Sequence, residues 1–156
     1  MHEVRWMNEA IQLAYRNVES GNGGPFGAIV VKDGKVIGTG VNEVTSHNDP
    51  TAHAEVQAIR EACRLLGSFQ LTDCDIYTSC EPCPMCLGAI YWARPRAVYF
   101  SFDRGEAASI GFDDAFIYDE IGAPLEQRRI PMHRLQGDTA EDPFVLWRTS
   151  HGRVEY

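Results

Sequence analysis

The feature that most constrains the fold of this chain is a set of three cysteines at every third position, in the octapeptide SCEPCPMC (residues 79–86). Thiolates bind zinc well, and a histidine added to all three would close a tetrahedral structural site. Two thiolates and one histidine would instead leave the fourth position to water, as in catalytic zinc sites. Both arrangements require a fold that brings a distant histidine to residues 79–86.

The N-terminal sequence bears on the compartment of these cysteines. The first ten residues, MHEVRWMNEA, carry charges and lack an apolar core, so we expect no secretory signal. No apolar run approaches the roughly 18 residues of a membrane span, and we expect a cytoplasmic protein. In that reducing compartment, clustered cysteines are more often metal ligands or catalytic groups than disulfides. The odd number of cysteines, five, also fits a disulfide framework poorly.

The first half of the chain has the pattern helix, hairpin, helix. Apolar residues at helical spacing predict a helix over residues 3–19. Two β-rich runs, 27–31 and 36–42, flank Asp33-Gly34, a dipeptide typical of a tight hairpin turn. Residues 49–51, DPT, begin a second helix of good helix formers.

The second half predicts a strand, a helix and a strand at 74–79, 83–93 and 96–101, then helical pieces near 113–121 and 141–149 with a strand between them at 130–136. Strand–helix–strand units imply parallel strands joined by right-handed crossovers. The chain is long enough for one well-buried core. We therefore expect a single α/β domain over residues 1–156, a three-layer α/β/α sandwich with a central mixed sheet.

The candidate metal ligands lie at the starts of two helices. His53 and Glu55 fall in the first turn of one, and Cys83 and Cys86, at i, i+3 spacing, fall in the first turn of the next. Neighbouring helices of parallel strand–helix units begin on the same side of the sheet, where ligands commonly bind. One imidazole and two thiolates suit zinc.

The third cysteine belongs to a different element. Cys80 precedes Glu81-Pro82. The residue before a proline favours extended backbone, so we place Cys80 at a strand end. His53, Cys83 and Cys86 then remain as protein ligands of one Zn²⁺ per subunit, with water as the fourth. Glu55 beside them becomes the candidate general base.

The sequences HAE (53–55) and PCPMC (82–86) resemble the signature of the zinc-dependent nucleobase and nucleoside deaminases. Within that superfamily the chain is most similar to the bacterial guanine deaminases with the cytidine deaminase fold, through GGPFGA, NDPTAHAE, TSCEPCPMCLGAIYWARP, GFDDAFIYDEI and a C-terminal Glu-Tyr. The resemblance implies hydrolysis of guanine to xanthine and ammonia, with Glu55 as the catalytic proton carrier.

Five further residues are candidates for binding the base. Asn42 can both donate and accept hydrogen bonds, as a purine edge requires, although a turn residue would look the same. Phe26 and Trp92 would sandwich a flat base, with core packing as the alternative. The resemblance assigns Asp114 to the guanine N–H groups, and Tyr156 to the closing of a partner subunit's site in a homodimer that exchanges its C-terminal segment, about residues 140–156.

The net charge of -8, from 14 basic and 22 acidic residues, argues against a nucleic-acid partner. A small purine base is the expected partner, and no membrane is expected. Three alternatives stay open. The first is a tRNA adenosine deaminase with similar motifs, and the second is a deaminase of guanosine, cytosine or an aminotriazine. The third is a zinc-stabilised binding module, which would need Cys80 as a fourth ligand.

Overall fold

The computed structural model describes residues 3–156, which divide into two compact units, Met1–Ala115 and Phe116–Tyr156. The first unit is built on a hairpin of strands β1 (Gly27–Lys32) and β2 (Lys35–Val41), paired antiparallel. Its turn places Asp33 at φ 49° and Gly34 at φ 70°. Positive φ at both central residues is the requirement of a type I′ turn, so the predicted hairpin is confirmed.

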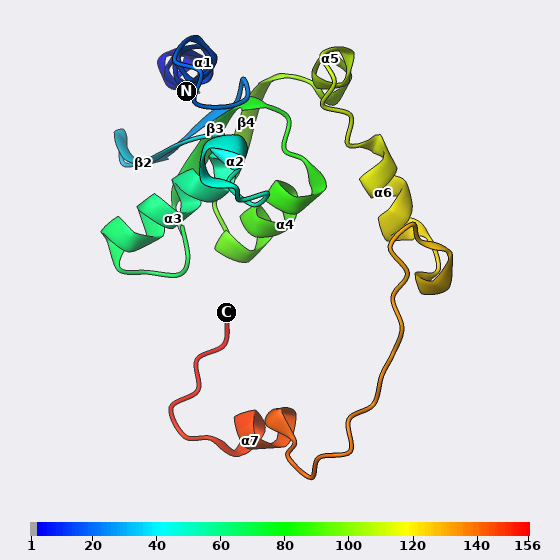
Figure 1. Cartoon of the computed structure of the whole chain (residues 1–156). Helices are drawn as coiled ribbons and strands as arrows, with labels where there is room; N and C mark the ends of the chain where they lie inside the picture. Colours follow the sequence, from blue (N-terminus) through cyan, green and yellow to red (C-terminus); the bar gives the residue numbers. More distant parts are fainter. Residues whose placement is uncertain (1–2) are drawn as a thin grey trace. The chain divides into compact units, whose positions relative to one another are not determined.

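Two more strands complete a mixed sheet of order β2-β1-β3-β4. Figure 1 shows the strands between helix α1 (Val4–Glu19) on one side and helices α3 (Ala54–Leu66) and α4 (Pro84–Ala93) on the other. Strand β3 (Cys74–Cys80) pairs antiparallel with β1 and parallel with β4 (Ala97–Phe102). The parallel pair is joined through helix α4, the strand–helix–strand unit expected from the sequence. Strand β3 therefore has a partner on each side, which holds its backbone firmly.

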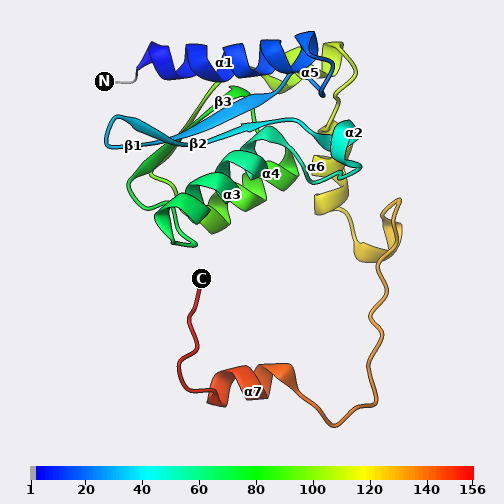
Figure 2. The same ribbon diagram turned by 60° about the vertical axis from the view of Figure 1, so that its left-hand side comes forward.

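Helices cover both faces of this sheet (Figure 2). Helix α1 packs on one face, and α3 and α4 pack on the other. The predicted three-layer α/β/α arrangement is confirmed. Gly40 of β2 makes the close approach of α3 possible, because a Cβ there would overlap the carbonyl oxygen of Ala54.

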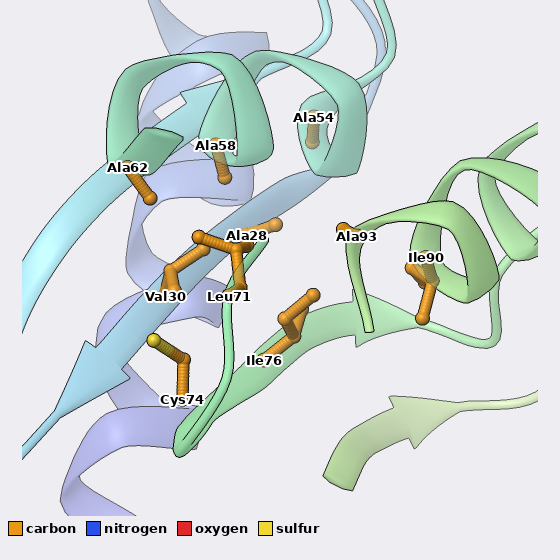
Figure 3. Packing of buried hydrophobic residues seen from close by; sticks show 10 residues of the cluster. All are labelled: Ala28, Val30, Ala54, Ala58, Ala62, Leu71, Cys74, Ile76, Ile90 and Ala93. Atoms are coloured by element: carbon orange, nitrogen blue, oxygen red, sulfur yellow. The ribbon is translucent and has the colours of Figure 1, made fainter. Parts of the chain in front are cut away.

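The core between the sheet and the α3–α4 layer is formed mainly by small and aliphatic side chains (Figure 3). Its buried members are Ala28, Val30, Ala54, Ala58, Ala62, Leu71, Cys74, Ile76, Ile90 and Ala93. A second cluster, Ala10, Ile29, Val31 and Tyr77, lies toward α1. Alternate residues of β1 thus point to opposite layers, as in a strand buried on both faces.

Shorter elements complete the chain. Two helices, α2 (Val44–His47) and α5 (Arg104–Ser109), were not predicted, whereas α6 (Ala115–Gly122) and α7 (Pro143–Thr149) match the predicted helical pieces. A 3₁₀ turn (η1) spans Leu125–Gln127. No helix within residues 3–156 combines the length and apolarity needed to cross a membrane.

The strand predicted at residues 130–136 is wrong, because this segment is irregular. A strand needs a neighbour to satisfy its backbone groups, and none of the four strands of the described chain pairs with it. The apolar residues that suggested a strand are exposed within their unit, with Leu135 94% exposed. The division into two units does not decide whether residues 1–156 fold as one domain, which stays a prediction.

Candidate metal centre and catalytic site

The three predicted metal ligands lie at helix starts. His53 is the N-cap of α3 and Cys83 is the N-cap of α4, both with extended backbone. Pro84 follows at the first helical position, where its fixed φ suits a helix start. The first turn of α4 then brings the Cys86 backbone N–H to the Cys83 sulfur at 3.5 Å. Local helix-start geometry therefore sets the positions of both sulfurs.

These side chains converge in space. The His53 Nδ1 atom is 3.5 Å from the Cys83 Sγ atom and 3.4 Å from the Cys86 Sγ atom. All three ligand atoms lie within 4.8 Å of one another, and this is the metal-ligand cluster found among residues 3–156. One nitrogen and two sulfur donors are the ligand types that zinc takes, so the residues present fit this ion.

One of the two sulfurs of the cluster is already in the form that binds a metal. Hydrogen bonds from Cys86 and His53 lower the pKa of the Cys83 thiol to about 4, so Cys83 is a thiolate at neutral pH. The same contact raises the pKa of Cys86, which holds the proton that the two sulfurs share. The hydrogen bond to Cys83 also raises the pKa of His53. The thiolate is the form that binds a metal, and a divalent cation would displace the shared proton.

Glu55 lies in the first turn of α3, two residues beyond His53, and is only 6% exposed. Its Oε1 atom accepts a hydrogen bond of 3.0 Å from the Thr78 hydroxyl group. Burial raises the pKa of the Glu55 carboxyl group, which brings it closer to a proton carrier that works near neutral pH. A buried carboxyl group beside a metal cluster is the arrangement that hydrolytic deamination requires.

The structure separates Cys80 from the ligand cluster. Cys80 ends strand β3, and its thiol donates to the carbonyl oxygen of Asp103 at 3.8 Å. Burial raises the pKa of this thiol to about 11, which disfavours the thiolate needed for zinc. Cys80 is therefore not part of the cluster of His53, Cys83 and Cys86, and the four-ligand arrangement that a zinc-stabilised binding module requires is not formed among residues 3–156.

Asn42 follows the end of β2 and is buried. Its backbone N–H donates to the carbonyl oxygen of Phe26 at 3.2 Å, so the two candidate base-binding residues are neighbours. The Asn42 carbonyl oxygen accepts from the Nδ2 atom of Asn17, a buried residue of α1, at 2.9 Å. The Nδ2 atom of Asn17 also donates to the Gly24 carbonyl oxygen at 2.8 Å. One amide thus joins the segments that carry Phe26 and Asn42.

The aromatic neighbours differ from the predicted pair. The Phe26 ring packs edge-on against Phe112, with ring centroids 4.9 Å apart and an interplanar angle of 88°. Trp92 lies on α4 with 61% of its surface exposed, so the alternative that it is a core residue is wrong. Whether Phe26 and Trp92 bind a base stays a prediction.

Asp114 is half-buried just before α6. Partial burial raises the pKa of the Asp114 carboxyl group. The charge of Arg104 lowers this pKa, and the charge of Cys83 raises it. Asp113 instead accepts from the backbone N–H of Ala115 at 2.9 Å. Tyr156 belongs to the second unit, and its role in closing a partner's site stays a prediction.

Sequence reasoning missed Thr78, Phe112 and Asn17. Thr78 had a detectable signal. It is a polar residue at a position of β3 where the alternation of Cys74 and Ile76 predicts an apolar one. Phe112 lies directly before the two acidic residues of GFDD (111–114), and nothing in the sequence distinguishes it from the other aromatic residues. Asn17 had a weaker signal, a short amide on the apolar side of a helix.

Comparison with known proteins agrees with this geometry. Residues 1–102, which include all three ligands and Glu55, match the family model "cytidine and deoxycytidylate deaminase zinc-binding region". The guanine deaminase of Bacillus subtilis (strain 168) is 54% identical over 156 residues, 100% of both chains. Its X-ray structure superposes with a TM-score of 0.96 and covers 100% of this chain and 99% of that one.

Two other relatives are more distant. The tRNA-specific adenosine deaminase of Buchnera aphidicola subsp. Schizaphis graminum is 45% identical over 95 residues, 61% of this chain and 62% of that protein. A structure of guanine deaminase from Nitrosomonas europaea has a TM-score of 0.67 at 32% identity, and covers 70% of this chain and 63% of that one. Given the matched zinc-binding region and the relative that aligns from end to end, the chain belongs to the cytidine and deoxycytidylate family of zinc deaminases.

Proposed function

We propose that this protein is a zinc-dependent guanine deaminase, which converts guanine and water to xanthine and ammonia. One observation carries the choice of substrate. The likeness to the Bacillus subtilis guanine deaminase extends over all 156 residues, whereas the Buchnera tRNA-specific adenosine deaminase matches over 95. The net charge of -8 also gives a tRNA backbone little to bind.

His53, Cys83 and Cys86 are the residues that would hold zinc. When bound, zinc supplies Lewis acidity that makes water a better nucleophile. Two thiolates offset most of the charge of the ion, so a protein base is still needed to take the proton of the water. Glu55 is the buried carboxyl group placed for this work.

Glu55 carries two protons in turn. It takes one from the water as the oxygen attacks C2 of guanine, and delivers it to N3 of the ring. It then takes the second proton from the new hydroxyl group and passes it to the amino group at C2. The C2–N bond breaks, ammonia leaves and the C2 oxygen becomes the carbonyl group of xanthine. Both protons originate in the water, so the step balances without another reactant.

We assign base recognition to Asn42, Asp114, Phe26 and Trp92. The Asn42 amide both donates and accepts, and so matches a purine edge that carries both kinds of group. The Asp114 carboxylate accepts from the N1–H and amino groups of guanine, which adenine does not present in that pattern. Phe26 supplies an aromatic face from the start of β1, and Trp92 is proposed as its counterpart.

We propose that the enzyme is a cytoplasmic homodimer in purine breakdown. The second unit leaves apolar side chains exposed, among them Phe144, Leu146 and Val154, which favours burial against another surface. Exchange of about residues 140–156 between subunits would bury them and bring Tyr156 to the partner's site. This exchange follows the resemblance to the bacterial guanine deaminases.

Ammonia release from guanine, adenine, guanosine, cytosine and an aminotriazine, beside a tRNA inosine assay, tests the substrate. Guanine is expected to be converted fastest, with xanthine formed in equal amount to ammonia. Glu55→Gln is expected to keep zinc and to lose nearly all turnover. Inosine formation in tRNA without guanine conversion would refute the assignment, and substantial activity of Glu55→Gln would refute the proton path.

A further inference from the structure

A buried hydroxyl group contacts the proposed proton carrier. Thr78 lies on β3 and is 1% exposed, and its Oγ1 atom donates to the Glu55 Oε1 atom at 3.0 Å. Cys74 and Ile76, four and two residues earlier, belong to the core cluster beneath α3. Alternation along a strand places Thr78 on that same face. The polar residue of an otherwise apolar face thus meets the first turn of α3.

The support for this hydroxyl group is rigid. Thr78 pairs with Ala28 of β1 and with Phe100 of β4, so strands flank its backbone on both sides. Its β-branched side chain has few χ1 rotamers. The Oγ1 atom is therefore held in place by the sheet, while Glu55 reaches it from a helix.

The hydrogen bond limits how the Glu55 carboxyl group can turn. A glutamate side chain has three rotatable bonds, and its final torsion is broad when nothing holds it. A carboxyl group is planar, so fixing one oxygen also fixes the direction of the other. A group that carries protons between a water, a ring nitrogen and an amino group needs such a fixed direction.

We infer that Thr78 is a positioning residue for Glu55, and that it sets the turnover rate rather than substrate affinity. This inference rests on the proposed function, in which Glu55 moves protons. The Thr78 hydroxyl group bonds to Glu55, whereas the contacts among His53, Cys83 and Cys86 do not involve Thr78, so zinc content should not depend on it.

Thr78→Val and Thr78→Ser test the inference. Valine keeps the shape and removes the hydroxyl group, whereas serine keeps the hydroxyl group and removes a methyl group. We expect Thr78→Val to lower kcat about 10- to 100-fold, as a misplaced catalytic group does, with KM changed less than about twofold. We expect Thr78→Ser to recover most of the lost rate. Zinc content should equal that of the wild type in both.

Ser79→Ala is the matched control, because Ser79 is the next buried hydroxyl residue of β3. Its Oγ atom accepts from the Gly27 backbone N–H at 3.1 Å, and alternation places it on the other face. Loss of this hydroxyl group should lower stability but leave kcat within about twofold, since it does not touch Glu55. A fall in kcat equal to that of Thr78→Val would overturn the inference.

A second comparison ties the effect to Glu55. If Thr78 acts through this carboxyl group, Thr78→Val added to Glu55→Gln should lower the residual rate no further. Full activity of Thr78→Val, no rescue by serine, or a change confined to KM would each refute the inference. If Thr78→Val does not fold, Thr78→Ala replaces it, since it adds no atoms. A wild-type enzyme inactive on guanine contradicts the proposed function instead, and Thr78 is then tested on the base that is deaminated.

Discussion

The hydrogen bonds of Asn17 make a sharp prediction about stability. Asn17 is 4% exposed, and its Nδ2 atom donates to the carbonyl oxygens of Gly24 and Asn42 at 2.8 and 2.9 Å. Its Oδ1 atom accepts from the Nδ2 atom of Asn22 at 2.7 Å. Replacement of Asn17 by alanine removes all three bonds at once.

The size of the loss in unfolding free energy depends on which hydrogen bonds each carbonyl oxygen retains in Asn17→Ala. The Gly24 oxygen retains the backbone N–H of Phe26 at 2.9 Å, so its loss is an ordinary hydrogen bond of about 1 kcal/mol. The Asn42 oxygen lies in a buried bond, and Gly23 packs so closely against it that water has little room to replace the amide. A buried unsatisfied acceptor costs about 1–3 kcal/mol. The sum is a loss of roughly 2–4 kcal/mol in unfolding free energy, or roughly 5–15 °C in Tm.

Urea and thermal unfolding of the zinc-loaded protein measure this loss. Asn22→Ala is the control, because it removes only the bond to the Asn17 Oδ1 atom and should cost less than about 1 kcal/mol. KM for guanine should also rise in Asn17→Ala, since Asn42 loses its support. A loss below about 1 kcal/mol in Asn17→Ala, or one equal to that of Asn22→Ala, would refute the reasoning.

Four further predictions concern the site and the segment proposed to close it. Burial raises the pKa of Cys80 to about 11, so alkylation at pH 8 should be slower at Cys80 than at a free cysteine, measured by peptide mass spectrometry; faster labelling would contradict the buried thiol. Cys80→Ser should keep both zinc and activity, and loss of zinc on metal analysis would point to a fourth ligand. Asp114→Ala should lower the ratio of guanine to other-base activity, and an unchanged ratio would remove Asp114 from recognition. Deletion of residues 152–156 should abolish most turnover if Tyr156 closes the site, and full activity would end that role.

The parts of the fold that could be predicted depend on local chemistry. The Asp33-Gly34 turn needs positive φ at two adjacent positions, and few dipeptides adopt it readily. Pro84 at the first helical position marks the start of α4, and the i, i+3 spacing of the sulfurs then follows from helix geometry. Helix α3 begins at Ala54, after the turn that contains Pro50. The cluster of His53, Cys83 and Cys86 could therefore be predicted from the sequence.

Other features were missed although a signal existed. Helix α5 begins with a full capping box, in which the Asp103 side chain accepts from the Glu106 N–H and the Glu106 side chain accepts from the Asp103 N–H. That sequence, D-x-x-E, marks a helix start even for a helix of six residues. The short length and the absence of an apolar periodicity hid it.

Features that depend on tertiary contacts could not be predicted. The Thr78–Glu55 hydrogen bond joins residues 23 apart in the sequence. The Phe26–Phe112 contact joins residues of the first unit that are still farther apart in the sequence. Apolar residues within 130–136 suggested a strand, but a strand also needs neighbours that this segment lacks. Trp92 shows the converse case, a large aromatic residue whose side of α4 faces outward.

The helix starts connect the fold to the function. An N-cap side chain usually accepts a hydrogen bond from the first turn and contributes about 1 kcal/mol. His53 occupies the N-cap of α3 without such a bond, so its ring is available to the cluster rather than to its own helix. Cys83 occupies the N-cap of α4, and its sulfur accepts from the Cys86 N–H, an interaction that stabilises the thiolate. Helix α3 therefore lacks a side-chain cap, whereas the cap of α4 is itself a predicted metal ligand. The first turn of α3 also carries Glu55, and the first turn of α4 also carries Cys86. Each helix start therefore supplies two residues of the proposed site.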